Sequence, residues 1–224
     1  MNTVECEKLV YSSSAAVYGS SDVFPINEEC LVSAQSVYGE TKAIGEKLIQ
    51  DWANTAISKS AVSLRYFNPV GAHPSVTLGE NSRTPPSGVM PLICAAGQTK
   101  GKIFHIYGSD YMTADGTAER DFIHIMDLAE AHQSAIDYCI DSTNYEVFNV
   151  GTGVSVSILD LLSTFEQITG QKIPYVYSSK RAGDVPRSLA SVDKASMSLG
   201  WRAQRSLDDM CLDAWNWSLK NYKN

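Results

Sequence analysis

The segment KLVYSSS, residues 8–14, decides the expected fold, because a short apolar run here ends in three serines. This pattern predicts a buried strand of a parallel sheet, with the serines at its carboxyl end. Further strands are expected at 61–67, 102–108, 145–150 and 172–178, helices at 37–59, 89–98, 157–170 and from 206 onward, and a strand followed by a helix within 118–139. Alternating strands and helices indicate an α/β fold with a mainly parallel sheet.

Local signals support several of these elements. Ser157 with Asp160, and Ser206 with Asp209, have the spacing of helix capping boxes, and Gly170 follows the first of these helices as a stop signal. The helix at 37–59 carries an apolar stripe, which consists of Val37, Ile44, Leu48 and Trp52. Residues 68–88 are rich in proline and glycine and predict an irregular segment, which in a compact domain usually carries function.

The composition excludes several classes of protein. The formal net charge is −7 and no Lys/Arg run exceeds two residues, so a basic surface for nucleic acid is not expected. Five scattered cysteines without a C-x-x-C indicate neither a zinc site nor a disulfide framework, and they favour a reducing, cytoplasmic location. No run of about 18 apolar residues occurs, so no membrane span is predicted. No metal site is expected.

Tyr38 and Lys42 are the candidate catalytic pair. Residues four apart lie on one face of a helix, so the two side chains can reach the same small volume. An ammonium group beside a phenol favours the phenolate, which makes Tyr38 a candidate general base. The serines at the end of the first strand are expected at the ligand-binding edge of the sheet. Serine, tyrosine and lysine together suit oxidation and reduction between a hydroxyl group and a ketone.

Four segments carry a resemblance to a known family: SSSAAVYG (12–19), YGETK (38–42), RYFNPVGAHPS (65–75) and DGTAERDFIHIMDLAEAH (115–132). The sequence resembles the extended short-chain dehydrogenase/reductases, and within them the UDP-glucose (UDP-galactose) 4-epimerases. The resemblance covers essentially the whole chain. The motif Y-x-x-x-K marks only the superfamily, whereas the two longest segments are more specific.

The resemblance implies a role for particular residues. Ser14, Tyr38 and Lys42 would be catalytic, and Ser12, Ser13, Tyr66 and Phe67 would join Tyr38 and Lys42 in contacting the NAD cofactor. Substrate-binding positions would be Asn68, Gly88, Val89, His105, Ile106, Tyr107, Arg120, Arg181, Asp184 and Ser188. Within this set, Arg120 and Arg181 would hold the pyrophosphate, and Asp184 would hold the ribose. Residues 105–107 would pass along the uracil. His124 is expected to be structural, and Gly151 and Gly153 to be turn residues.

The implied reaction interconverts UDP-glucose and UDP-galactose through transient oxidation at sugar C4 by bound NAD. Gly88 stands where the family usually has a substrate-binding asparagine. Ser188 stands where the family has either a bulky tyrosine or a small cysteine, so we expect room for UDP-N-acetylhexosamines as well. The family forms homodimers through the helix that bears Tyr38 and a neighbouring helix, of which only the first is identified in this sequence.

The sequence departs from the family at its beginning. No G-x-G-x-x-G turn is present, although a dinucleotide site needs one after its first strand. We therefore expect residues 1–72 with 122–152 to form the C-terminal part of an NAD-binding Rossmann domain that lacks its N-terminal βα units. Residues 73–121 with 153–224 would form a smaller α/β lobe for UDP-sugar. On this interpretation the chain is an incomplete fragment that binds NAD weakly or not at all and does not turn over alone.

Two alternatives stay open. One is a non-catalytic module that keeps the nucleotide-sugar lobe. The other is a related nucleotide-sugar dehydratase or decarboxylase with the same Ser-Tyr-Lys set. A dehydratase would need an additional acid/base pair, and the sequence has no carboxylate pair next to Tyr38 or Ser14.

Overall fold

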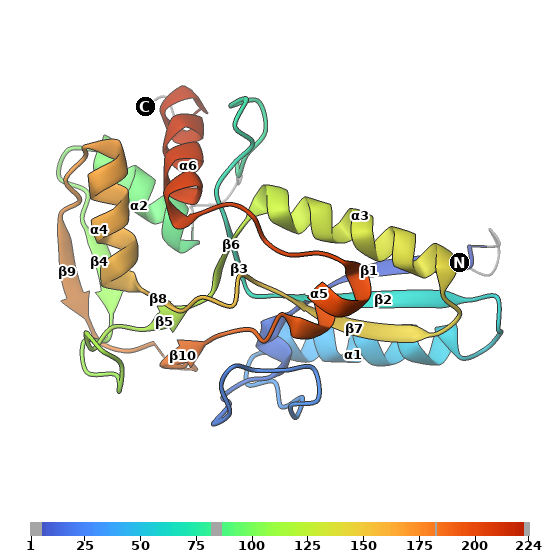
Figure 1. Ribbon diagram of the computed structural model, residues 1–224. Helices are drawn as coiled ribbons and strands as arrows, with labels where there is room; N and C mark the ends of the chain where they lie inside the picture. Colours follow the sequence, from blue (N-terminus) through green and yellow to red (C-terminus); the bar gives the residue numbers. More distant parts are fainter. Residues whose placement is uncertain (1–5, 82–86, 182, 222–224) are drawn as a thin grey trace.

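The computed structural model of the chain describes residues 6–81, 87–181 and 183–221. It has the α/β architecture that the sequence predicts (Figure 1). The helices are α1 (Val37–Ala53), α2 (Val89–Gln98), α3 (Ile125–Asp141), α4 (Ile158–Thr169), α5 (Asp193–Leu199) and α6 (Leu207–Asn221). The strands are β1 (Lys8–Ser14), β2 (Ser60–Tyr66), β3 (Asn68–Val70), β4 (Phe104–Tyr107), β5 (Glu119–Arg120), β6 (Phe122–His124), β7 (Tyr145–Val150), β8 (Val156–Ser157), β9 (Tyr175–Ser178) and β10 (Arg187–Ser188).

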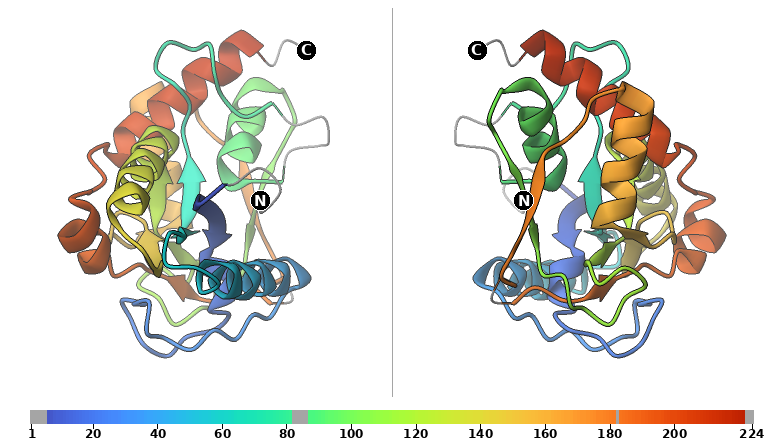
Figure 2. Two further views of the ribbon diagram at one scale, coloured as in Figure 1. Left: turned by 90° about the vertical axis from the view of Figure 1, so that its right-hand side faces the viewer. Right: turned by 90° about the vertical axis from the view of Figure 1, so that its left-hand side faces the viewer.

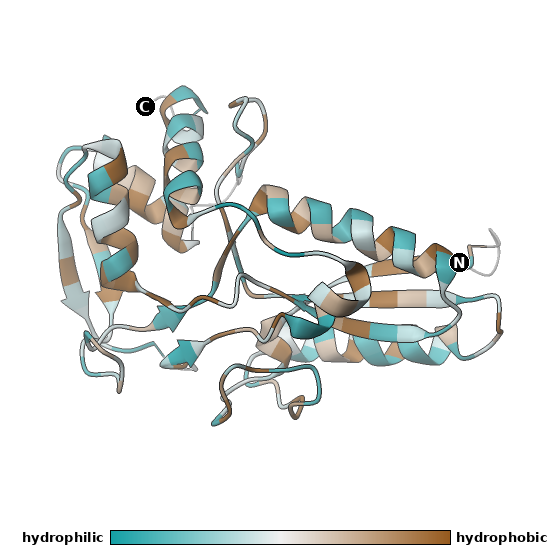
Figure 3. Ribbon diagram, in the orientation of Figure 1, coloured by the Kyte–Doolittle hydropathy of each residue, from teal (hydrophilic) through white to brown (hydrophobic). Residues whose placement is uncertain are grey.

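A parallel three-stranded sheet, in the order β1-β2-β7, forms one end of the molecule. α3 covers one face of this sheet and α1 covers the other (Figure 1). Every residue of β2 except Tyr66 is buried, because this strand lies between two strands and two helices. Figure 3 shows hydrophobic segments along β2 and β7. The predicted strand at 8–14 is therefore confirmed, and it brings its serines to the carboxyl edge of a parallel sheet.

A second hydrophobic core lies at the other end of the molecule (Figures 1 and 2). α2, α4 and α6 pack there with the parallel pair β4–β9. Phe165 and Trp215 contribute to this core and meet edge to face, with ring centroids 5.6 Å apart, a favourable aromatic geometry. Two small sheets, β10-β5-β8 and β3-β6, lie between the two cores.

The helix signals in the sequence are confirmed by the hydrogen bonds at the helix ends. The Ser157 hydroxyl accepts a hydrogen bond from Asp160 N at 2.9 Å, and Gly170 ends α4 in the left-handed conformation with φ of 69°. Ser206 and Asp209 form a reciprocal capping box: Asp209 N donates to Ser206 Oγ at 3.2 Å, and Ser206 N donates to Asp209 Oδ2 at 2.8 Å.

The helix that bears Tyr38 is shorter than predicted. α1 ends at Ala53 rather than near Lys59, and Asn54 N closes its last turn by donating to Gln50 O at 3.1 Å. The apolar stripe of this helix lies largely on its solvent side: Val37 is 83 % exposed and Leu48 is 65 % exposed. The buried residues of this helix are instead Gly39, Glu46 and Ala53, and Glu46 bonds to the sheet through Ser13 and Arg65.

One helix has no counterpart in the sequence prediction. α5 follows β10, and its Ala195 packs with Trp201 against the core of the three-stranded sheet. Residues 193–203 therefore lie with the sheet core, although the sequence grouped them with the smaller lobe. Most of the predicted irregular segment after β3 is non-regular, and its residues 82–86 lie outside the described part of the chain.

Candidate active site

The three serines that end β1 do not share one face, because side chains alternate along a strand. Ser13 is fully buried, and its hydroxyl donates to the carboxylate of Glu46 on α1. The side chain of Ser14, the next residue, points to the other face of the strand, where it lines an open pocket of about 220 Å³. The side chain of Ser13 therefore faces α1, whereas those of Ser12 and Ser14 point to the other face of the strand.

Lys42 links α1 to the end of β1. Its Nζ donates to Ser12 O at 2.7 Å and lies 5.5 Å from the centre of the Tyr38 ring. Tyr38 itself is 56 % exposed, so a ligand has access to it. Ser36 begins this helix, and its hydroxyl accepts a hydrogen bond from Gly39 N at 3.0 Å. The structure thus brings the i,i+4 pair and the serine strand together.

Tyr66, at the end of β2, is held by a residue that the sequence analysis missed. Its hydroxyl lies 2.7 Å from His132 Nε2, and His132 Nδ1 lies 2.8 Å from Leu128 O. A carbonyl oxygen only accepts, so Nδ1 donates to it, and in the neutral imidazole Nε2 then accepts from the tyrosine. Burial raises the pKa of Tyr66, so the hydroxyl stays a donor at neutral pH. His132 ends the segment DGTAERDFIHIMDLAEAH, but nothing in that segment indicates its partner.

Arg120, Arg181 and Asp184 form a charged cluster. Arg181 Nε lies 2.9 Å from Asp184 Oδ2, and the Arg181 guanidinium stacks 4.5 Å over the Tyr107 ring. Burial and the nearby Arg181 lower the pKa of Arg120, and Asp184 opposes this shift. The cluster therefore carries more positive than negative charge, and a bound anion would relieve the repulsion between the two guanidinium groups.

Arg120 and Asp184 border two pockets at once. One is the pocket that Ser14 lines, which also includes Phe67, Asn68 and Ser188. The other, of about 190 Å³, is lined by β4 residues together with Arg120, Arg181 and Asp184. Since Asn68 lines both, the serine strand and the arginine cluster lie on one continuous groove.

β4 forms one wall of the second pocket. His105 and Tyr107 lie on its exposed face, and His105 Nδ1 is 2.9 Å from Ser178 Oγ on β9. Ile106 is only 1 % exposed and packs in the core. Of the three residues assigned to the uracil, Ile106 can therefore offer its backbone but not its side chain.

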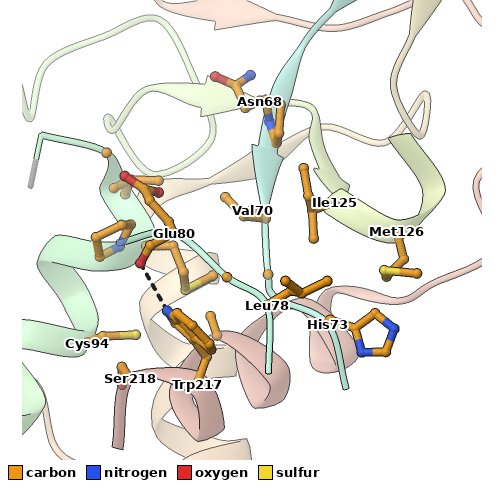
Figure 4. A pocket seen from close by; sticks show the side chains of 18 of the residues that line it. Asn68, Val70, His73, Leu78, Glu80, Cys94, Ile125, Met126, Trp217 and Ser218 are labelled. Carbon is orange, nitrogen blue, oxygen red and sulfur yellow. Dashed lines mark hydrogen bonds between the residues drawn. The ribbon is translucent and has the colours of Figure 1, made fainter. Parts of the chain in front are cut away.

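A larger apolar cavity of about 700 Å³ lies beside Asn68 (Figure 4). Gly88 and Val89, at the start of α2, border it, as does Trp217 of α6. Trp217 Nε1 donates to Glu80 O at 2.9 Å, which joins α6 to the loop after β3. The sequence analysis did not find this cavity, because its walls come from several separate segments of the chain.

His124, Gly151 and Gly153, which are expected to have structural roles, make contacts within the fold. His124 is fully buried, accepts from Met126 N at 3.0 Å through Nδ1, and lies 3.2 Å from Asp213 Oδ2 of α6 through Nε2. Burial lowers the pKa of His124, and Asp213 opposes this shift. Gly153 has φ of 74°, which suits a turn glycine. Gly151 lies against Asp121: an added Cβ would be 2.6 Å from Asp121 Oδ2.

Within residues 6–81, 87–181 and 183–221, no group of three or more histidine, cysteine or acidic side chains is arranged to hold a metal ion. No helix in the same residues has both the length and the apolar composition needed to cross a membrane.

Comparison with known proteins gives a consistent result. Residues 1–151 match the NAD dependent epimerase/dehydratase family. The chain is 40 % identical over 215 residues to the UDP-glucose 4-epimerase of Bacillus subtilis. The matched region covers 96 % of this chain and 63 % of that relative. The chain is 42 % identical over 217 residues to the UDP-glucose 4-epimerase of Drosophila melanogaster, of which it covers 62 %. The chain thus spans less than two thirds of the length of these curated relatives.

Solved structures with the same fold include an epimerase from Stenotrophomonas maltophila with bound NAD and formylated UDP-arabinopyranose. Its TM-score is 0.95 at 40 % identity, over 98 % of this chain and 66 % of that one. A UDP-glucose 4-epimerase from Bifidobacterium longum, in complex with NAD⁺ and UDP, has a TM-score of 0.93 at 39 % identity, over 99 % of this chain and 66 % of that one.

Proposed function

The chain belongs to the NAD dependent epimerase/dehydratase family, and we propose that it contributes the catalytic and UDP-sugar-binding residues of a UDP-glucose/UDP-galactose 4-epimerase. The observation that carries this proposal is the groove that runs from Ser14, at the end of the serine strand, to the arginine cluster. Lys42 is held at the end of the same strand and lies beside the Tyr38 ring. An exposed phenol beside an ammonium group suits proton transfer at a sugar hydroxyl. A cationic cluster at the other end of the groove suits a diphosphate.

The residues next to the Ser14 end of this groove fit the nicotinamide end of NAD. Ser12 and Tyr38 are exposed, and Lys42 Nζ stands between the end of β1 and the Tyr38 ring. Tyr66 and Phe67 close the adjacent part of the sheet edge. When bound there, NAD supplies the redox chemistry at sugar C4. In this proposal Tyr38 takes the proton of the 4-hydroxyl and later returns it. Ser14 orients the sugar oxygen, and Lys42 places its ammonium group beside the Tyr38 ring.

The substrate would lie with its diphosphate on Arg120 and Arg181 and its ribose at Asp184. The uracil would lie along the exposed face of β4, where the Tyr107 ring is held by the Arg181 guanidinium. Epimerisation needs the diphosphate to be held firmly while the sugar turns over, and this asymmetry fits charged side chains at one end and small ones at the other. Gly88 and Ser188 are small, and the space at Ser188 supports acceptance of UDP-N-acetylhexosamines as well as UDP-hexoses.

We also propose the division into a Rossmann-type part and a UDP-sugar lobe, with residues 193–203 assigned to the first because α5 packs there. The exposed apolar stripe of α1 supports a homodimer through this helix. All five cysteines are free thiols, which supports a reducing, cytoplasmic location.

Turnover of UDP-galactose to UDP-glucose tests the proposed activity. The 224-residue chain is assayed with NAD, alone and together with the part of the Bacillus relative that it does not match. We expect epimerisation in the second mixture. We expect Tyr38→Phe to lower kcat by roughly 10²-fold or more, the usual contribution of a general base. The control Tyr175→Phe, on β9 away from the groove, should leave kcat unchanged.

Calorimetry with UDP distinguishes the proposed epimerase from the alternative, a non-catalytic binding module. UDP binding without turnover in either mixture would favour that module, and a lack of both would contradict the proposed function. Product formed by the chain with NAD alone would show that the described residues are sufficient for the reaction.

A further inference from the structure

The carboxylate of Asp121, between β5 and β6, accepts four hydrogen bonds. It is fully buried. Its Oδ1 accepts from Thr152 N and Thr152 Oγ1, both at 2.7 Å. Its Oδ2 accepts from Gly153 N at 2.9 Å and from Ala190 N at 3.2 Å. One carboxylate thus joins the turn after β7 to the segment after β10.

The backbone of the same residue holds two positions of the proposed substrate groove. Asp121 O accepts from both Asn68 N and Asn68 Nδ2, each at 3.0 Å. Asp121 N donates to Ser188 O at 2.9 Å. Arg120 is its immediate neighbour, and Ser188 is paired with Arg120 in the β5–β10 ladder. Three groove residues from three segments are therefore fixed by one residue.

We propose that Asp121 is the positioning residue of the groove: its carboxylate ties two loops to the β5–β6 junction, and its backbone then sets Asn68, Arg120 and Ser188 relative to one another. This inference rests on the proposed UDP-sugar function. The hydrogen bond from Asn68 Nδ2 to Asp121 O orients the Asn68 side chain and uses one of its two amide hydrogens. The amide oxygen and the second hydrogen stay available for a ligand.

The groups around the Asp121 oxygens suit an ionised carboxylate, and they oppose burial, which raises the pKa of Asp121. All four groups around the Asp121 oxygens are donors, and an amide side chain offers only one acceptor oxygen. In Asp121→Asn, at least one backbone N–H would therefore face another donor, whichever way the amide turned. Gly151 fits the same requirement, because an added Cβ would stand 2.6 Å from Oδ2 and displace the carboxylate.

The first test is amide hydrogen exchange on the unliganded chain, with Leu64 in the centre of β2 as the reference for global unfolding. In Asp121→Asn we expect the Asn68 backbone amide to exchange at least tenfold faster relative to that of Leu64. An unsatisfied buried donor destabilises the closed form enough to raise the equilibrium constant for local opening by about that factor. Unchanged relative protection of Asn68 would overturn the proposal.

The second measurement is the Kd of UDP by calorimetry. We expect it to rise roughly tenfold in Asp121→Asn and in Gly151→Ala, whose added Cβ would displace the same carboxylate. The matched control is Asp127→Asn, which also removes a fully buried carboxylate, one that accepts from Arg205 N at 3.1 Å. This control should lower stability but leave the UDP affinity and the relative exchange of Asn68 unchanged.

The two measurements separate the two proposals. If the unmodified chain does not bind UDP, the proposed function fails for the chain alone, and the exchange result still decides the role of Asp121. If Asp127→Asn weakens UDP binding as much as Asp121→Asn does, the effect is general destabilisation and the positioning role is wrong. If Asp121→Asn does not fold, Gly151→Ala carries both measurements.

Discussion

The guanidinium of Arg65 binds both carboxylate oxygens of Glu46, with Nε 2.9 Å from Oε1 and Nη2 2.6 Å from Oε2. Both side chains are at least nine-tenths buried. Glu46 lies on the helix that bears Tyr38, and it also accepts from Ser13 on β1. Glu46 therefore fixes the Tyr38 helix to β2 through Arg65 and to the serine strand through Ser13.

Removal of one partner from this pair should be costly. We expect Glu46→Ala to lower the free energy of unfolding by about 3–5 kcal/mol, because Arg65 would keep a buried charge without its counter-ion. Urea denaturation measures the change. The control is Lys47→Ala, at the next position of α1, whose partner Asp51 lies at 2.7 Å with both side chains more than half exposed. Its loss should stay below about 1 kcal/mol, and equal losses in the two variants would contradict this account.

Gly39 allows α1 to approach the turn that follows β1. An added Cβ would lie 2.5 Å from the backbone oxygen of Ala16 and 3.0 Å from the Ala34 Cβ. No side-chain rotation relieves that contact, so Gly39→Ala should destabilise the chain by about 1–3 kcal/mol in urea denaturation, as overpacking does. Gly97→Ala on α2 is the matched control, because its Cβ would meet only side-chain atoms, the nearest being Ile173 Cδ1 at 3.0 Å. A larger loss in the control would refute the argument.

The stability of the chain should depend on the ionisation of Glu119. The hydrogen-bonded Arg187 guanidinium, at 2.6 Å, lowers the pKa of Glu119 below its ordinary value of 4.5. A lowered folded-state pKa means that the native state binds fewer protons than the unfolded state. The stabilisation is therefore complete above pH 4.5 and is lost as the pH falls through the folded-state pKa.

Thermal melts between pH 7 and pH 3 test this expectation. Glu119→Gln should melt at a lower temperature than the unmodified chain at neutral pH, and the difference should shrink as the pH falls. Arg187→Gln should behave in the same way, and the double variant should add little to either. A difference that stays constant across the range would show that the ion pair does not contribute to the pH dependence.

The apolar stripe of α1 should drive self-association. Ile44 is 57 % exposed and Leu48 is 65 % exposed on the same helix. We expect the chain to sediment as a dimer at micromolar concentration and Ile44→Lys/Leu48→Lys to sediment as a monomer, since desolvation of charges opposes association. The control is Ile57→Lys, which changes an equally apolar residue that is 87 % exposed but lies beyond the end of α1. Dimers of the double variant would exclude this helix as the interface.

Much of the fold follows from patterns that act over short distances. The strand at 8–14, the caps at Ser157 and Ser206, and the approach of Lys42 to Tyr38 all depend on residues within a few positions of one another. Such features are predictable, because the hydrogen bonds and side-chain spacing that produce them are local.

The remaining features depend on contacts between distant segments. The orientation of Ser13 is set by Glu46, the hydroxyl of Tyr66 by His132, and the loops after β7 and β10 by the carboxylate of Asp121. The solvent-facing stripe of α1 is a further example, since an apolar periodicity predicts a face to be covered and does not say whether the same chain covers it.

The position of β2 in the middle of its sheet also has a consequence during synthesis. Ser60 Oγ, at its beginning, bonds to Asn144 O, and these residues are 84 positions apart. At translation rates of roughly 5–20 residues per second, one edge of β2 stays unpaired for roughly 4–17 s after it is made. During that interval the nascent chain presents an open apolar strand edge, a form that chaperones bind and that aggregates in their absence.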